Sequence, residues 1–145
     1  MWEKNQIEKD FKRIIKNMEL EEWDIKLEFI EYDFKNTGNI KIDLEDKSAI
    51  VYLNIFNPKS DNYEEILIHE LCHLKLWKLD QYCESLLNST FDNQDSKEYR
   101  FAYDQFMLNL EQTTQELTKT YLPLIAKNKN HSFVRCEKRM KFKEE

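Results

Sequence analysis

Glycine, proline and cysteine are scarce in this sequence of 145 residues. Gly38 is the only glycine, which excludes a Gly-rich phosphate loop and a dinucleotide-binding fingerprint, because each needs several glycines. The three cysteines, Cys72, Cys83 and Cys136, form no Cys-x-x-Cys pair, so neither a disulfide framework nor an all-cysteine zinc site is expected. Unpaired cysteines are typical of a reducing compartment, and we therefore expect a cytoplasmic location.

Long hydrophobic runs are also absent. No apolar stretch approaches the roughly 18 residues that a membrane-spanning helix needs, so we expect no membrane partner. Hydrophobic residues make up 41% of the chain and charged residues 34%, which is typical of a folded globular protein rather than a disordered one. The length predicts a single domain with one hydrophobic core.

Charge is distributed unevenly along the chain. Residues 126–145 carry seven basic and three acidic side chains, whereas residues 1–125 carry 15 basic and 25 acidic ones. An acidic body repels a phosphate backbone, so only the basic end is suited to contact nucleic acid. We predict a domain over residues 1–126 and a basic C-terminal tail over residues 127–145. The tail lacks an apolar period, and we expect it to be unpacked and dispensable for stability.

Apolar periodicity in the first part of the chain predicts one helix followed by a sheet. Helical spacing over residues 2–18 predicts an N-terminal helix with one buried face. Alternating apolar and polar residues then predict three strands, over residues 23–29, 40–44 and 49–56. Because their connections are short, we expect a three-stranded antiparallel sheet.

Two helices are predicted in the second part of the chain. Residues 62–79 are strongly apolar and follow a capping-box pattern with Asp61 as the cap. After a polar loop over residues 88–95, a long helix is predicted over residues 96–121, ended or kinked by Pro123. The fold class predicted from the sequence is therefore α+β.

The strongest chemical signal is His69-Glu70-Leu71-Cys72-His73, an HExxH motif within the first of these two helices. Residues four apart share one helix face, so both imidazoles can reach one ion. Two imidazoles suit zinc and leave room for a third protein ligand and a water, from which Glu70 can take a proton. Burying a polar group without a partner costs free energy. The presence of His69, Glu70 and His73 in so apolar a helix therefore favours a metal site over core packing.

The third ligand must come from another element, because the next acidic residues on the motif helix, such as Glu84, lie too far along its axis. The long helix is the candidate. Glu111 lies at the edge of its apolar stripe and can face the motif helix, whereas Glu116 shares a polar face. Glu111 is therefore the predicted ligand. Asp104 is the alternative ligand, or a partner that orients a ligand histidine.

The motif at residues 69–73, followed by Glu111-Gln112-Thr113-Thr114-Gln115-Glu116-Leu117, resembles the minimal gluzincins. These are small single-domain zinc metallopeptidases of the zincin class, many of them from phages and mobile elements, and the resemblance covers roughly residues 5–122. It implies a site in which Zn²⁺ is held by His69, His73 and Glu111, with Glu70 as the general base. It also implies that a protein or peptide substrate binds as an extended strand along residues 51–55.

These features together predict a zinc-dependent metallopeptidase that hydrolyses peptide bonds with a metal-activated water and Glu70 as general base. The alternative is a zincin-like interaction or regulatory module that binds zinc without strong protease activity. Thermolysin-like relatives of the minimal gluzincins carry a second lobe whose His or Tyr steadies the oxyanion. The candidates for that role here are Tyr99, Arg100, Tyr103 and His131.

Overall fold

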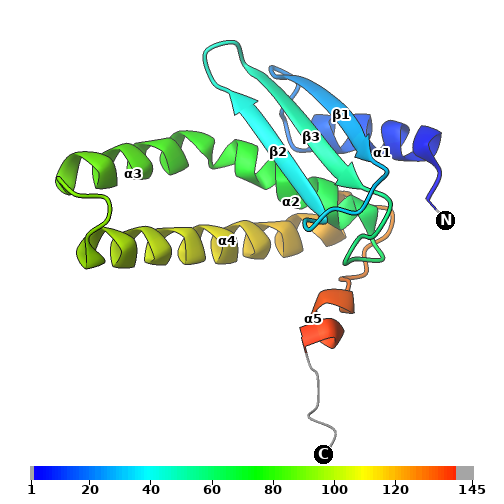
Figure 1. The fold of residues 1–145 in the computed structure, drawn as a ribbon. Helices are drawn as coiled ribbons and strands as arrows, with labels where there is room; N and C mark the ends of the chain where they lie inside the picture. Colours follow the sequence, from blue (N-terminus) through cyan, green and yellow to red (C-terminus); the bar gives the residue numbers. More distant parts are fainter. Residues whose placement is uncertain (1, 140–145) are drawn as a thin grey trace, which may run out of the picture.

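The computed structural model describes residues 2–139 and confirms the α+β class. The elements in chain order are α1 (Lys4–Asn17), β1 (Asp24–Ile30), β2 (Gly38–Asp43), β3 (Ser48–Asn54), α2 (Tyr63–Lys75), α3 (Trp77–Thr90), α4 (Lys97–Ile125) and α5 (Val134–Arg139). The helices α1 and α2 lie behind the sheet, and α3 and α4 form a long antiparallel hairpin that extends beyond it (Figure 1). None of the described helices is both long and apolar enough to cross a membrane.

The sheet is mixed, so the predicted antiparallel arrangement is wrong. Its strand order is β1-β3-β2, with β3 parallel to β1 and antiparallel to β2. The segment 31–37 is long enough to carry the chain past one strand position, a distance of two strand spacings or about 9.6 Å, which leaves the centre to the apolar strand β3. The predicted substrate strand, residues 51–55, therefore lies in or next to a strand paired on both sides. The edge strand on the side of α2 is β2.

The core is built around α2, which carries the HExxH motif. Six of its apolar side chains are buried: Ile66, Leu67, Ile68, Leu71, Cys72 and Leu74. They pack with the helical stripe Ile7, Phe11 and Ile14 of α1 and with Val51 and Leu53 of β3. Burying a large apolar side chain contributes about 1.5–3 kcal/mol, so α2 is held firmly in place.

The boundaries of the motif helix differ from the prediction at both ends. Asn62, and not Asp61, caps α2, because its side-chain oxygen accepts hydrogen bonds from the first backbone N–H groups of the helix. The helix ends at Lys75, and after Leu76 the chain continues as α3 through part of the predicted loop. Because the backbone of Leu76 stays in the right-handed helical region, α3 continues in nearly the same direction, as Figure 1 shows.

The long helix also differs from the prediction at its ends. Ser96 caps α4 by accepting a hydrogen bond from the backbone N–H of Tyr99, so the helix proper begins at Lys97, one residue later than predicted. The helix continues through Pro123 to Ile125. Because Pro123 lies in the last turn, it removes a hydrogen bond only where the helix is about to end.

Residues 127–132, here called the strap, run from the end of α4 over the start of α2. The carboxylate of Glu64, which is 2% exposed, accepts hydrogen bonds from the backbone N–H groups of Lys127 (3.1 Å) and Asn128 (2.9 Å). Arg13 of α1 donates to the same carboxylate at 2.6 Å. The expectation of an unpacked tail is therefore wrong for residues 127–132, because polar contacts hold them where no apolar period is present. Residues 140–145 of that tail lie outside the described residues.

We expect Glu64→Ala to lower the free energy of unfolding by about 3 kcal/mol, because Arg13 and two backbone N–H groups lose a buried charged partner. Urea unfolding followed by circular dichroism measures this change. The control is Glu8→Ala, at an exposed position of α1, which should change stability by less than about 0.5 kcal/mol. Equal stability of the two variants would show that the strap does not anchor α2.

Candidate metal centre

Three side chains from two helices converge at one point. One donor atom each of His69 and His73 on α2 and of Glu111 on α4 lie within 4.8 Å of one another. The distance from His73 Nε2 to Glu111 Oε1 is 3.0 Å, and that from His69 Nε2 to Glu111 Oε2 is 3.4 Å. Tetrahedral zinc with bonds of about 2.0–2.1 Å separates its donors by about 3.3 Å, so the observed spacing fits one such ion. Asp104, the alternative ligand, is not part of this group.

Small side chains on α4 allow it to approach α2 closely enough to form this group. Thr114 and Thr118 are fully buried, and each hydroxyl donates to the carbonyl four residues earlier in its own helix. Their polar groups are thus satisfied within α4, which allows these small side chains to be buried where the two helices meet. Glu111 lies one turn before Thr114, which brings its carboxylate to the histidines at the edge of the contact.

Gln115 orients the first histidine and is a residue that the sequence analysis did not assign. The Nδ1–H of His69 donates to Gln115 Oε1 at 2.9 Å. This bond selects the tautomer whose Nε2 is free to bind a metal and turns that atom toward Glu111. The spacing of four residues between Glu111 and Gln115, which places both on one helix face, is the signal that could have identified it.

Glu70 lies beside the ligands in a buried position against β2. Its residue is 7% exposed, and no hydrogen bond to its carboxylate is found among residues 2–139. A Cβ atom placed on Gly38 would lie 2.9 Å from Glu70 Oε1 and 2.8 Å from Ile66 Cγ2. Glycine therefore leaves room for Glu70 at this point of the edge strand, a role that the sequence alone did not reveal.

Burial and neighbouring charge shift the pKa values of these groups in opposite directions. Burial raises the pKa of Glu70, although the nearby His69 and His73 oppose this shift. Hydrogen bonds from the same two histidines hold the pKa of Glu111 well below its usual range. Burial alone would lower the pKa of His69, but the hydrogen bond with Glu111, together with the charges of Glu70 and Glu111 and the bond to Gln115, raises that pKa overall. The carboxylate of Glu111 is thus kept charged, and that of Glu70 is made more basic.

The four candidates for an oxyanion donor lie outside the group of ligands. Tyr99 donates to Asn88 at 2.8 Å near the far end of the α3–α4 hairpin and stacks on Tyr103. His131 belongs to the strap and pairs with Glu65 of α2 at 2.9 Å. Arg100 is exposed on the first turns of α4, and along that helix it lies about 16 Å from Glu111. None of the four is positioned beside the ligands.

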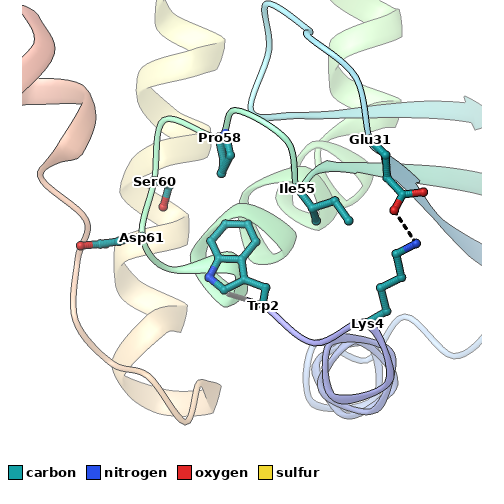
Figure 2. Close-up of a pocket in the computed structure, with 7 residues that line it drawn as sticks. All are labelled: Trp2, Lys4, Glu31, Ile55, Pro58, Ser60 and Asp61. Carbon is teal, nitrogen blue, oxygen red and sulfur yellow. Dashed lines mark ion pairs between the residues drawn. The ribbon is translucent and has the colours of Figure 1, made fainter.

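A separate pocket of about 430 Å³ lies where the N-terminus meets the loop after β3, as Figure 2 shows. Its lining residues are Trp2, Lys4, Glu31, Ile55, Pro58, Ser60 and Asp61. Lys4 and Glu31 close one side with an ion pair of 2.6 Å, while Asp61 points away from the pocket. No lining residue belongs to the His69, His73 and Glu111 group, so this pocket is distinct from the candidate metal centre.

No known protein family, curated protein or solved structure matches this chain. The geometry of the site and the chemistry of its residues are therefore what indicate its function.

We expect Glu111→Ala to weaken zinc binding by more than about a hundredfold, because water must replace a charged oxygen in a site whose whole free energy is about 10–16 kcal/mol. Competition with a chromogenic chelator measures the affinity. Glu116→Ala and Asp104→Ala remove the same charge from exposed positions of α4 and should bind zinc like the wild type. Wild-type affinity in Glu111→Ala would remove Glu111 from the ligand set.

We expect Gln115→Ala to weaken zinc binding about 10- to 100-fold, because His69 loses the bond that fixes its tautomer and ring orientation. The same competition measurement applies. Gln112→Ala, at an exposed position three residues earlier, is the control and should have no effect. If both variants bind zinc equally well, the bond from His69 to Gln115 does not support the site.

Proposed function

We propose that this protein is a zinc-dependent metallopeptidase. One observation carries the proposal: His69, His73 and Glu111 converge with the donor spacing of a zinc site, directly beside the largely buried carboxylate of Glu70, which accepts no hydrogen bond from the described residues. Two histidines and one carboxylate, with a position left for water, form the ligand set of catalytic rather than structural zinc sites. The HExxH motif supplies both the ligands and the base from one helix.

The chemistry divides between the metal and Glu70. Zinc, when bound, lowers the pKa of water and polarises the carbonyl that is to be attacked. Glu70 accepts the proton of the attacking water and returns it to the leaving amine. A carboxylate whose pKa is raised by burial is a stronger base, which suits this transfer near neutral pH. Gln115 and the fixed position of α2 keep the ligands in place while the proton moves.

The edge strand β2 is the element best placed to bind a peptide. Its one neighbour in the sheet is β3, so its other edge offers backbone N–H and C=O groups to an added strand. Gly38, at the start of β2, lies against Glu70, which brings that edge directly to the proposed base. A substrate held through backbone hydrogen bonds accepts many sequences, since side chains contribute little to this mode of binding.

One observation favours the alternative of a zinc-binding interaction module. None of Tyr99, Arg100, Tyr103 and His131 lies beside the ligands, so the described residues supply no evident donor to the oxyanion that forms during hydrolysis. Losing one such donor slows hydrolysis by about 10²–10³-fold in a well-studied protease. A module that binds zinc for recognition would keep the ligands and the fold but would show no turnover.

The variant Glu70→Gln tests the proposal. We expect it to keep its zinc content and its melting temperature but to lose peptide hydrolysis by at least about 10²-fold, because a neutral amide cannot accept the proton. Metal analysis, thermal unfolding and cleavage of a mixed fluorogenic peptide library measure the three properties. Zinc-loaded wild type without any cleavage would favour the interaction module, and loss of zinc from Glu70→Gln would make Glu70 a ligand.

A further inference from the structure

The pairing of β2 with β3 determines which backbone groups of β2 point to its free edge. In an antiparallel pair, the N–H and C=O groups of alternate residues point to the partner strand, and those of the residues between them point away from it. The backbone N–H of Asn54 donates to the carbonyl of Thr37 at 3.0 Å, so the bonds to β3 continue at every second residue after Thr37. The backbone groups of Gly38, Ile40 and Ile42 therefore point to the free edge.

One of these outward N–H groups already has a partner. The backbone N–H of Ile40 donates to the side-chain Oδ1 of Asn39 at 2.9 Å. Among residues 2–139 the side chain of Asn39 forms no other hydrogen bond, so this contact alone holds its amide over the edge. The amide oxygen thus takes the position that a backbone carbonyl of an added strand would occupy.

Asn39 reaches the edge from the face of the sheet opposite to α2. Side chains along a strand alternate between its two faces. Those of Ile40 and Ile42 pack on the core, and a Cβ atom on Gly38 would meet Glu70 of α2. The side chain of Asn39 therefore starts on the other face and turns over the edge to reach the N–H of the next residue. It can turn back without breaking a contact with the core.

The contact between Asn39 and Ile40 lies close to the candidate metal centre. Gly38, which leaves room for the carboxylate of Glu70, precedes Ile40 by two residues, or about 6.8 Å along an antiparallel strand. A peptide that pairs with β2 in front of Glu70 meets the outward groups of Gly38 and then those of Ile40. Its second pair of backbone hydrogen bonds therefore needs the N–H that Asn39 covers.

We propose that the side chain of Asn39 competes with an extended peptide substrate for the backbone N–H of Ile40. This inference rests on the function proposed above, in which β2 binds the peptide beside Glu70. The substrate exchanges one hydrogen bond for another, so the competition lowers its affinity and does not prevent its binding. Without substrate, the same contact covers a donor through which an edge strand would otherwise pair with other chains.

The variant Asn39→Ala tests the competition, because it removes the acceptor and leaves the backbone of β2 in place. Amide hydrogen exchange at Ile40, followed by NMR, should become faster by about threefold or more. Peptide binding is measured with short fluorescent peptides without charged residues, titrated against zinc-loaded protein that also carries Glu70→Gln to prevent cleavage. We expect Asn39→Ala to bind them about 3- to 10-fold more tightly, the factor that corresponds to one net hydrogen bond.

The matched control is Lys41→Ala, at the next position on the same face of β2, where the backbone N–H points to β3. It should change neither the exchange rate of Ile40 nor the peptide affinity. Weaker peptide binding by Asn39→Ala would mean that Asn39 itself holds the substrate, and affinities equal to that of the control would mean that no competition occurs. Either result overturns the proposal. A doubled mass of Asn39→Ala in light scattering, without tighter peptide binding, would make a second copy of the chain the occupant and would also overturn it.

Cleavage by zinc-loaded protein with native Glu70 separates this proposal from the peptidase. We expect Asn39→Ala to hydrolyse the same peptides with a KM that is lower by the factor found for binding. Hydrolysis with an unchanged KM would overturn the competition and leave the peptidase intact. Tighter binding by Asn39→Ala without hydrolysis of any peptide would overturn the peptidase and leave the competition intact, in a module that binds peptides.

Discussion

The contact between α2 and α4 is the constraint on which the rest of the structure depends. The proposed zinc ligands are divided between these two helices, so the distance between their axes sets the distance between His73 and Glu111. Thr114 and Thr118 make that distance short, and Glu64 fixes the end of the contact by holding the strap that follows α4. A local change at either place would move one ligand relative to the others, because close-packed helices transmit small displacements.

The edge strand β2 leaves the candidate metal centre open to a further chain on one side. A central strand such as β3 cannot accept a further chain, whereas β2 has a free edge beside Glu70. The one glycine in the sequence stands where the strand backbone comes closest to that carboxylate, because a Cβ there would overlap with Ile66 and Glu70. The position of this single glycine therefore indicates where the strand approaches Glu70. Its backbone conformation does not require glycine, because its φ is not positive.

Sequence reasoning succeeded where the structure depends on local periodicity. The spacing of His69 and His73 within an apolar helix, and the phase of Glu111 on the long helix, follow from 3.6 residues per turn, and the structure brings these three side chains together. The order of the strands could not be predicted in this way, since parallel pairing of β1 with β3 depends on a crossing that no local pattern records. The packing of the strap could not be predicted, because its contacts are polar and its sequence has no apolar period. Asn62 and not Asp61 is the cap, because the side-chain amide of Asn62 also donates to the carbonyl groups of Asn128 and Asn130 in the strap.

Two carboxylates of α2 show how burial separates a structural role from a chemical one. Glu64 is 2% exposed and Glu70 is 7% exposed, and both belong to the same helix. Glu64 accepts hydrogen bonds from Arg13 and from two backbone N–H groups, so its desolvation is offset within the fold. Glu70 accepts no hydrogen bond from the described residues, and the charges that oppose the effect of its burial are those of His69 and His73. Because burial raises its pKa, Glu70 is suited to the proton transfer proposed for it, whereas the carboxylate of Glu64 is occupied by the hydrogen bonds that hold the strap.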